Sequence, residues 1–414
     1  MDNVLAVLLA GGKGTRLEPF TRDRAKPDVP FGAVYRIIDF ALSNCVNSRL
    51  MRGLVLTQYK SLSLESHITR AWARFYHPEF GQSLEIASPQ QRVSDDWYLG
   101  TANAVYQNLY SIEKSGADDI LVLAADHVYK MDYRPMLEFH RRHGGVATVA
   151  AIRCATGEAA GQFGVLHVDP ASHVVGFQEK PDRPEPLPGE EDYCLASMGI
   201  YVFSAAFLTA ELQRSAEGAD PAHDFGSHVL PRIIGREAVH AFLYSGQGTG
   251  ASGYWRDVGT VDAYFQANMD LLDPRPALNV YDRTWPIYSA QPSSPPPRLA
   301  VVPVPAREGP GYNLVANGTL VDGSVQGSVV GFDCRIARDA LVEDSILFNG
   351  VSVESGAEVR RAVLDEGVVV RRGARIGSDH EQDRQSGFLV SEGGVTCVPA
   401  GTITDRVSET TARG

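Results

Sequence analysis

The sequence has few cysteines, no long apolar run and no excess of positive charge. Its five cysteines are odd in number and widely spaced, without a CxxC pair or a cysteine–histidine cluster, so we expect reduced, mostly buried thiols. No apolar stretch approaches the ~20 residues that span a bilayer, and the N-terminal apolar run is too short for a secretion signal. We therefore expect a soluble, cytoplasmic protein. The cysteines are Cys45, Cys154, Cys194, Cys334 and Cys397.

The charge and the length set two further limits. A formal net charge of −12 argues against nucleic acid as the principal partner, because nucleic-acid binders need a basic face. The chain of 414 residues is longer than one ordinary core supports, so two domains are expected.

A glycine-rich turn follows the first apolar stretch, in the run LLAGGKGTRL at residues 8–17. Glycines let a backbone approach a ligand closely, so that N–H groups point at phosphate oxygens, and Arg16 adds a fixed charge with a planar fork of donors. The spacing fits neither GxxxxGK[ST] nor GxGxxG, which disfavours those two families. Taken alone, the run could be a surface turn between a strand and a helix.

Up to Leu272, short apolar runs alternate with amphipathic stretches, a pattern typical of βα units around a mainly parallel sheet. A helix is expected after Gly100, with Thr101 as its cap and Ala102, Val105, Leu109 and Ile112 as core. The expected strands are Val4–Ala10, Gly53–Thr57, Ile120–Ala124, Ala147–Ile152 and Tyr201–Phe203.

The C-terminal part has a different periodicity. Residues 273–311 are rich in proline, which predicts an extended linker. Beyond it, aliphatic residues recur at six-residue spacing, which is typical of a parallel β-helix, with a slip between Val342 and Val353. An antiparallel β-sandwich would give a similar pattern of short strands and turns. The expected domains are residues 1–272, a linker at 273–311, a β-helix at 312–400 and a tail at 401–414.

Charged residues near predicted strand ends suggest a phosphate and metal site. Lys26, in RAKP, lies in a turn fixed by Pro27 and would supply a second cation for a polyphosphate. Asp126 follows a buried strand, where ligands bind in open parallel sheets, although a lone aspartate there is more often a helix cap or turn residue. With Asp257, in WRDVGT, it makes a sufficient carboxylate pair for Mg²⁺.

Two other segments suggest recognition of a sugar phosphate and a base. Glu179 and Lys180 pair an acceptor for hydroxyls with a cation for a phosphate, with Ser197 downstream, although they could also be a surface ion pair. Gln91 and the glycine backbone near Thr101 could read a base edge, or could be loop structure.

Eight segments carry a resemblance to a known family. The chain resembles the glucose-1-phosphate adenylyltransferases, the ADP-glucose pyrophosphorylases of bacterial glycogen synthesis, whose fold is a nucleotidyltransferase domain followed by a left-handed β-helix. The segments cover the first domain, and RAKP, YRIIDF and WRDVGT point to the adenylyl branch. In order they are LLAGGKGTRL, RAKPDVPFG with YRIIDFALSNCVNS, LTQYKSLSL, WYLGTANAVYQN, AADHVYKMDY, FQEKP, ASMGIYVF and WRDVGT.

The resemblance implies transfer of the adenylyl group of ATP to glucose 1-phosphate, with Mg²⁺ as the cofactor. It assigns catalysis to Arg16, Lys26, Asp126 and Asp257, the two aspartates holding the metal. Nucleotide binding is assigned to Leu9, Ala10, Gly11, Gly12, Gly14, Thr15, Gln91, Gly100 and Thr101. Sugar-phosphate binding is assigned to Tyr98, Gly164, Glu179, Lys180 and Ser197.

Departures from the family pattern limit what can be carried over. Asp23 and Pro30 replace a lysine and a histidine of enterobacterial relatives, so activation by fructose 1,6-bisphosphate is doubtful. Asn103 and Ser227 replace the aspartate of TADAV and the lysine of DFGKD. The resemblance still implies a homotetramer regulated by phosphorylated metabolites, with Arg24 and Arg36 as effector contacts. The alternatives are a sister enzyme that uses UTP, dTTP or GTP, and a non-catalytic regulatory subunit.

Overall fold

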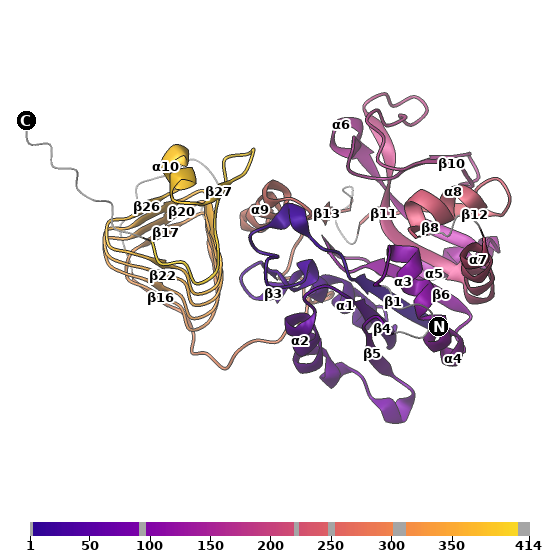
Figure 1. The fold of residues 1–414 in the computed structure, drawn as a ribbon, viewed down its shortest axis with the longest axis horizontal. Helices are drawn as coiled ribbons and strands as arrows, with labels where there is room; N and C mark the ends of the chain where they lie inside the picture. The colour runs from indigo at the N-terminus through magenta and orange to yellow at the C-terminus, as the bar shows by residue number, and fades with distance from the viewer. Residues whose placement is uncertain (1–2, 91–96, 219–222, 247–252, 301–311, 405–414) are drawn as a thin grey trace, which may run out of the picture. The chain divides into compact units, whose positions relative to one another are not determined.

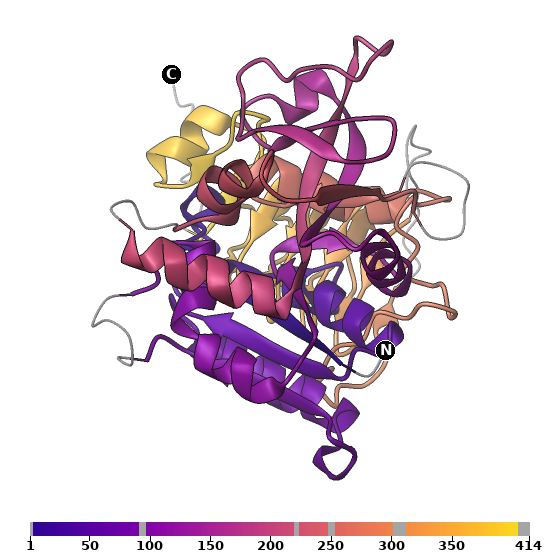
Figure 2. The ribbon, with the colours of Figure 1, turned by 90° about the vertical axis from the view of Figure 1, so that its right-hand side faces the viewer.

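The computed structural model describes residues 3–90, 97–218, 223–246, 253–300 and 312–404. Two compact units interleave along the sequence. The first unit contains Met1–Gly12, Phe40–Trp255 and Trp285–Ile287; the second contains Lys13–Asp39, Arg256–Thr284 and Tyr288–Gly414. Figures 1 and 2 trace the elements of the two units in two views. In the described ranges, no helix has the length and apolar character needed to cross a membrane.

The first unit is built on a sheet whose parallel half carries the glycine turn. Strand β1 (Val4–Ala10) lies between β4 (Arg52–Thr57) and β6 (Asp119–Ala124), and β4 also pairs with β5 (Ser83–Ala87), all in parallel. Strands β1, β4 and β6 are largely buried and rich in Val, Leu and Ile, as expected of parallel strands covered on both faces, whereas β5 at the edge is more exposed. Leu9 pairs with Ala124, so the residues that follow β1 and β6 emerge at one edge of the sheet.

The other half of the sheet is organised by one long strand. Strand β11 (Tyr193–Ser204) pairs antiparallel with β6, β8 (Ala147–Ala155) and β9 (Val165–Val168). Strand β10 (Val174–Gln178) continues antiparallel from β9, and β12 (Val239–Leu243) is parallel to β8. The expected strand Tyr201–Phe203 is thus only the end of a longer one, and the other four expected strands are confirmed.

The helix expected after Gly100 is present but interrupted. It forms α3 (Thr101–Gln107) and α4 (Leu109–Ser115), which are separated at Asn108. The N-cap is Gly100 rather than Thr101, so the capping prediction was wrong: the threonine hydroxyl bonds Asp224 instead. The four predicted core residues are buried. The other helices of this part are α1 (Ile37–Asn47), α2 (Leu62–Trp72), α5 (Arg134–His143), α6 (Thr156–Ala159), α7 (Ala205–Glu217) and α8 (Leu230–Ile233).

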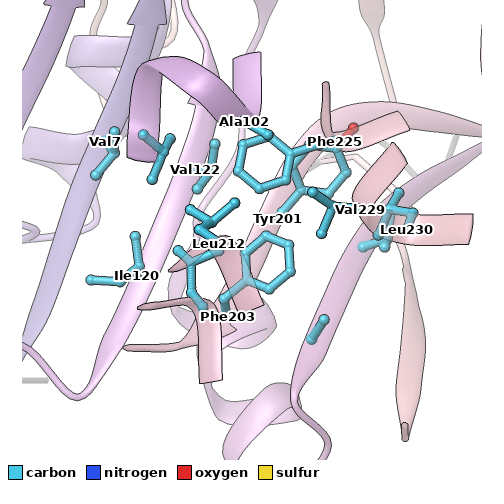
Figure 3. Packing of buried hydrophobic residues seen from close by; sticks show 14 of the residues in the cluster. Val7, Ala102, Ile120, Val122, Tyr201, Phe203, Leu212, Phe225, Val229 and Leu230 are labelled. Atoms are coloured by element: carbon cyan, nitrogen blue, oxygen red, sulfur yellow. The ribbon is translucent and has the colours of Figure 1, made fainter. Parts of the chain in front are cut away.

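The core of the first unit joins strands and helices from distant parts of the chain (Figure 3). Phe203 of β11 stacks on Phe225, with ring centroids 5.4 Å apart, and Tyr201 lies 5.5 Å from the same ring. Leu212 of α7 and Val122 of β6 belong to the same cluster. The packing therefore fixes the strand edge that carries the predicted site residues.

The second unit contains a parallel β-helix. Its strands form three parallel sheets, which excludes the β-sandwich; β27 (Leu389–Val390) pairs antiparallel with β28 (Thr396–Val398) at one end. The three sheets contain β14 (Arg298–Leu299), β16 (Leu320–Val321), β19 (Arg335–Ile336), β22 (Ser352–Val353) and β25 (Val369–Val370); β15 (Leu314–Val315), β18 (Val329–Val330), β21 (Ile346–Leu347) and β24 (Ala362–Leu364); and β17 (Ser324–Gln326), β20 (Leu341–Glu343), β23 (Glu358–Arg360) and β26 (Arg375–Ile376).

The slip in the six-residue spacing has a structural explanation. Arg335 pairs with Ser352 and Leu341 with Glu358, a separation of 17 residues in both cases, so one side of each coil is a residue shorter than the other two. Leu347, five residues after Val342, occupies the inward position that the sequence pattern left out. The predicted inward residues are buried in one cluster: Val330, Ile336, Val342, Val353, Val359, Val370 and Ile376.

The second unit also contains segments from before the β-helix. Phe20 packs on Phe348 with ring centroids 5.4 Å apart, and Gly32 N–H donates to Asn268 Oδ1 over 2.9 Å. These contacts tie residues 13–39 and α9 (Val261–Met269) to the coils. Short elements complete the fold: η1 (Thr15–Leu17), η2 (Lys26–Asp28), β2 (Pro30–Phe31), β3 (Tyr35–Arg36), β7 (His127–Tyr129), β13 (Trp255–Asp257) and α10 (His380–Gln385).

The described part of the proline-rich segment, residues 273–300, is largely irregular, as expected of a linker, but it has anchored points. Strand β14 pairs with β16, and Trp285 is buried with its Nε1–H donating to Asn44 Oδ1 over 2.9 Å. The domain bounds taken from the sequence remain a prediction.

Candidate active site

The glycine turn continues β1 into a short helical turn. Gly14 has φ of +64°, a backbone conformation that residues with a side chain rarely adopt. Thr21 Oγ1 donates to the Gly14 carbonyl oxygen over 2.8 Å. A Cβ added at Gly11 would lie only 3.1 Å from Gln58 Cβ. Gly12 and Thr15 are exposed, so the turn presents backbone to solvent at the carboxyl end of the strand.

Two predicted catalytic residues meet within the second unit. Lys26 Nζ lies 2.8 Å from Asp257 Oδ1, although 231 residues separate them, and the lysine is buried. Arg16 approaches the same place: a Cβ added at Gly259 would lie 3.1 Å from Arg16 Nη2 and 3.0 Å from Asp257 Oδ1. Two cations and one carboxylate therefore gather around the glycine of WRDVGT, as a polyphosphate site requires.

Asp126 lies in the first unit, in the tight turn between β6 and β7. It does not begin a helix, so the helix-cap alternative is excluded. Its carboxylate is partly exposed and lies 3.6 Å from His127 Nε2, and the imidazole packs edge-on against Trp255 at 5.0 Å. Because Ala125 N–H donates to Leu9 O over 3.2 Å, Asp126 is held at the strand edge where the glycine turn begins.

Glu179 and Lys180 follow β10 within the first unit. A Cβ added at Gly226 would lie 2.4 Å from Glu179 Oε2, so the carboxylate packs against this glycine backbone. Burial raises the pKa of the Glu179 carboxyl, Lys180 opposes the shift and Asp224 adds to it. Lys180 has φ of +45°, a left-handed backbone conformation that marks a constrained turn.

Ser197 and Gly164 are joined by a backbone contact. Ser197 N–H donates to the Gly164 carbonyl over 2.8 Å, and the serine is buried in β11. Gly164 leaves room for a ring, because an added Cβ would lie 2.4 Å from Phe177. These residues and Glu179 thus come from three adjoining segments of one sheet.

The residues assigned to the adenine end have structural partners. Thr101 Oγ1 donates to Asp224 Oδ1 over 3.1 Å, and a Cβ at Gly100 would lie 2.5 Å from His223 O. Tyr98, which was assigned to the sugar phosphate, is buried nearby, with its hydroxyl 2.9 Å from Asn108 Nδ2, so its side chain faces the core. Gln91 lies outside the described residues.

Two of the departures from the family pattern, Asn103 and Ser227, have different surroundings. Asn103 Oδ1 accepts from Leu99 N–H and from Gln107 Nε2, both over 3.0 Å, which are bonds that an aspartate oxygen would also accept. Ser227 is exposed within η5 (Phe225–Val229). Asn103 therefore preserves the local structure of α3.

The two arginines proposed as effector contacts are already paired. Arg24 Nη1 lies 3.0 Å from Asp365 Oδ1 and Nη2 lies 3.3 Å from Glu366 Oε2, within the second unit. Burial lowers the pKa of Arg24, but the charges of Asp365 and Glu366 outweigh it and raise the pKa overall. Arg36 pairs with Asp28, whose side chain is fully buried.

Two family models and several known proteins match this chain. A family model described as nucleotidyl transferase matches residues 5–274, and a GlmU-like, C-terminal hexapeptide model matches residues 303–398. A glucose-1-phosphate adenylyltransferase of Rhodopirellula baltica is 47% identical over 405 residues, covering 97% of this chain and 91% of the relative. The chain belongs to the glucose-1-phosphate adenylyltransferase family. It is a nucleotidyltransferase.

Other members of the family are similarly close. Proteins of this name from Shewanella sp. (strain W3-18-1) and Shewanella frigidimarina are each 43% identical over 394 residues, covering 95% of this chain and 94% of the relative. The family resemblance seen in the motifs is thereby confirmed over nearly the whole chain, as is the combination of a nucleotidyltransferase sheet with hexapeptide repeats.

Two functional supports were missed by the sequence analysis. The Asp224 carboxylate accepts hydrogen bonds from both the backbone N–H and the side-chain hydroxyl of Thr101. Gln58 packs on Gly11, and its side-chain amide donates to Tyr98 O over 3.2 Å. Asp224 begins the segment that corresponds to DFGKD of the family, in which the sequence analysis considered only the departure at Ser227. Gln58 lies in the family motif LTQYKSLSL, and its place in that motif was the signal that could have identified it.

Proposed function

We propose that this chain transfers the adenylyl group of ATP to α-D-glucose 1-phosphate, giving ADP-glucose and pyrophosphate for α-glucan synthesis. The observation that carries the proposal is the grouping of Lys26, Asp257 and Arg16 around Gly259. It supplies cations for a triphosphate, and the name of the family indicates the substrates.

The reaction needs no covalent intermediate on the protein. A phosphate oxygen of glucose 1-phosphate attacks the α-phosphorus of ATP in line; the bond from that phosphorus to the bridging oxygen breaks, and pyrophosphate leaves. The attacking oxygen is already anionic, so no general base is required. Arg16 and Lys26 would neutralise charge on the triphosphate, and the exposed N–H groups of the glycine turn would orient it.

Magnesium fits the residues available. Asp126 and Asp257 offer carboxylate oxygens, the ligand type that Mg²⁺ prefers, and His127 adds an imidazole beside Asp126. We assign the metal to the two aspartates. When bound, Mg²⁺ would neutralise phosphate charge and polarise the reacting phosphorus. Asp257 would also orient Lys26, because the two are bonded.

The sugar phosphate would bind the first unit. Lys180 would hold its phosphate as a point charge. The Glu179 carboxylate would accept hydrogen bonds from the sugar hydroxyls and the Ser197 hydroxyl would donate or accept them, with Gly164 shaping that side and Tyr98 supporting it from the core. Leu9, Ala10, Gly11, Gly12, Gly14 and Thr15 would line the triphosphate, and Gln91, Gly100 and Thr101 the adenine.

The deciding experiment measures pyrophosphate release with Mg²⁺ and glucose 1-phosphate, comparing ATP, UTP, dTTP and GTP. Release with ATP alone is expected. Preference for another nucleotide would make this a sister enzyme. Absence of release under every condition, with correct folding, would favour a regulatory subunit.

The proposal extends to regulation and assembly. We propose a cytoplasmic homotetramer controlled by a phosphorylated metabolite that competes with carboxylates for Arg24 and Arg36. A dose-response series with fructose 6-phosphate, glucose 6-phosphate, fructose 1,6-bisphosphate, phosphate and AMP tests this. Kinetics unchanged by all five would contradict it, and light scattering would test the tetramer.

A further inference from the structure

Two cysteines lie directly opposite each other in the sheet of the first unit. Cys154 of β8 pairs in register with Cys194 of β11, and the two strands are antiparallel. Residues opposite one another in an antiparallel pair project from the same face, with Cβ atoms about 4.5–5.5 Å apart. Disulfides join residues with Cα atoms about 4.4–6.8 Å apart and Cβ atoms about 3.5–4.5 Å apart. The Cα spacing of an antiparallel pair, about 4.5–5.5 Å, lies within this range, and a bond between the two sulfurs would draw the Cβ atoms together by up to about 1 Å.

The surroundings of the pair make the two thiols unequal. Cys194 is buried against Ala159 and Val165, and Cys154 packs on the same small cluster but is partly exposed. Burial raises the pKa of the Cys194 thiol. An oxidant from solvent would therefore reach Cys154 first.

The other three cysteines lack this arrangement. Cys45, Cys334 and Cys397 are all buried, and burial raises the pKa of the first two to about 12. In the described strands, Cys397 lies opposite Val363 and Leu389 rather than a cysteine. The pair is therefore chemically distinct within this chain.

We propose that Cys154 and Cys194 are a reversible redox modification site that takes a low-molecular-weight disulfide as oxidant. The Cys154 thiolate attacks one sulfur of that disulfide and releases the other half as a thiolate. The Cys194 thiolate then attacks Cys154 Sγ and releases the second half. The protein loses two protons and two electrons, and the small disulfide becomes two thiols.

The site adjoins the sugar-phosphate residues, so oxidation has a functional consequence that rests on the proposed function. Val165, in the cysteine cluster, pairs with Gln178 just before Glu179 and follows Gly164. Cys194 precedes Ser197 on β11 by three residues. A bond between β8 and β11 would fix the spacing of these strands, and it raises the KM for glucose 1-phosphate severalfold.

The chemistry is tested by treating the full chain with oxidised glutathione, alkylating it under denaturing conditions and mapping peptides by mass. The expected product has Cys154 linked to Cys194 and three alkylated cysteines. Cys194→Ala keeps one glutathione on Cys154, while Cys45→Ser, the control, behaves as the unaltered chain. Glutathione retained on Cys154 of the unaltered chain, or five alkylated thiols, would overturn the site.

The functional consequence is measured separately, as KM before and after oxidation and after reduction with dithiothreitol. A rise that reduction reverses, and that Cys154→Ala abolishes, is expected. A linked Cys154–Cys194 pair with an unchanged KM would overturn the coupling to the sugar side. Absence of pyrophosphate release in both redox states would contradict the proposed function while the mapped disulfide still stands.

Discussion

The sheet of the first unit and the β-helix of the second bury their cores by different routes. In the sheet, residues as far apart in the chain as Val7 and Phe225 belong to one cluster, and each core residue has its own set of neighbours. In the β-helix, Ile336 and Val353 are stacked because 17 residues separate successive coils. The role of a β-helix residue is therefore set by its place in a repeat, whereas the role of a sheet residue is set by contacts that no repeat specifies.

The largest expected effect distinguishes these two kinds of packing. Phe203→Ala should lower the free energy of unfolding by about 3–5 kcal/mol, because it leaves a large cavity among dissimilar neighbours. Val353→Ala should cost about 2 kcal/mol, the loss of two methyl groups within a stack of similar side chains. Chemical denaturation followed by circular dichroism measures both. Equal losses would remove the distinction between the two cores.

The next prediction concerns the proposed metal ligand at the edge of the sheet. Asp126→Asn should lower turnover about a hundredfold or more, because a metal ligand and its charge are lost, while the free energy of unfolding stays near normal. The matched control is Asp339→Asn at a corner of the β-helix, where φ of +63° suits asparagine. Comparable turnover in the two variants would remove Asp126 from the metal site.

A smaller effect is expected at the sugar side. Lys180→Ala should raise the glucose 1-phosphate concentration required by about tenfold or more, with turnover largely retained, since a charge-assisted contact to phosphate is worth ~1.5–3 kcal/mol. Lys180→Arg keeps the cation and should recover part of the loss. Initial-rate kinetics at saturating ATP separate the two parameters. An unaltered sugar-phosphate dependence in the alanine variant would contradict the assignment.

The smallest effect is a pH dependence that arises from two histidines of the first unit. Burial lowers the pKa of both His140 and His240. For His140, Asp119 opposes this shift, while His240 and Arg141 lower the pKa further. For His240, His173 and His143 lower the pKa further, and Asp169 opposes the shift. Both imidazoles therefore bind protons less readily in the folded chain. Their contribution to stability is present above about pH 6.5 and is lost as pH falls through the folded pKa values.

Denaturation of the full chain between pH 5 and pH 8 tests this dependence. His240→Gln should reduce the slope of stability against pH, because it removes one of the two imidazoles. A slope that His240→Gln does not alter would show that this imidazole is not responsible.

The sequence was informative where its signals were local or periodic. The strand Val4–Ala10 and the inward residues of the β-helix could be predicted because apolar runs and a repeat define them. The long strand β11 was underestimated, since Cys194 to Ser197 carry little strand preference and are held by pairing with β8 and β9. Tertiary contacts overrode the local pattern there.

The site was predictable as a set of residues but not as an arrangement. Family motifs named Lys26 and Asp257, yet nothing in the sequence specifies that a bond joins residues 231 positions apart. The same holds for Thr101 with Asp224 and for Arg24 with Asp365. Such contacts depend on how whole segments pack, which a single sequence encodes only collectively.

The fixed length of the coil also determines which changes of chain length the protein can absorb. Removing residues 335–351 would bring Ser352 to the place of Arg335, shortening the stack by one layer while keeping every later aliphatic residue inward. Removing one residue more or fewer would put all later strands out of phase with their neighbours. We expect natural insertions and deletions in this region to be multiples of a whole coil, or to lie at its corners.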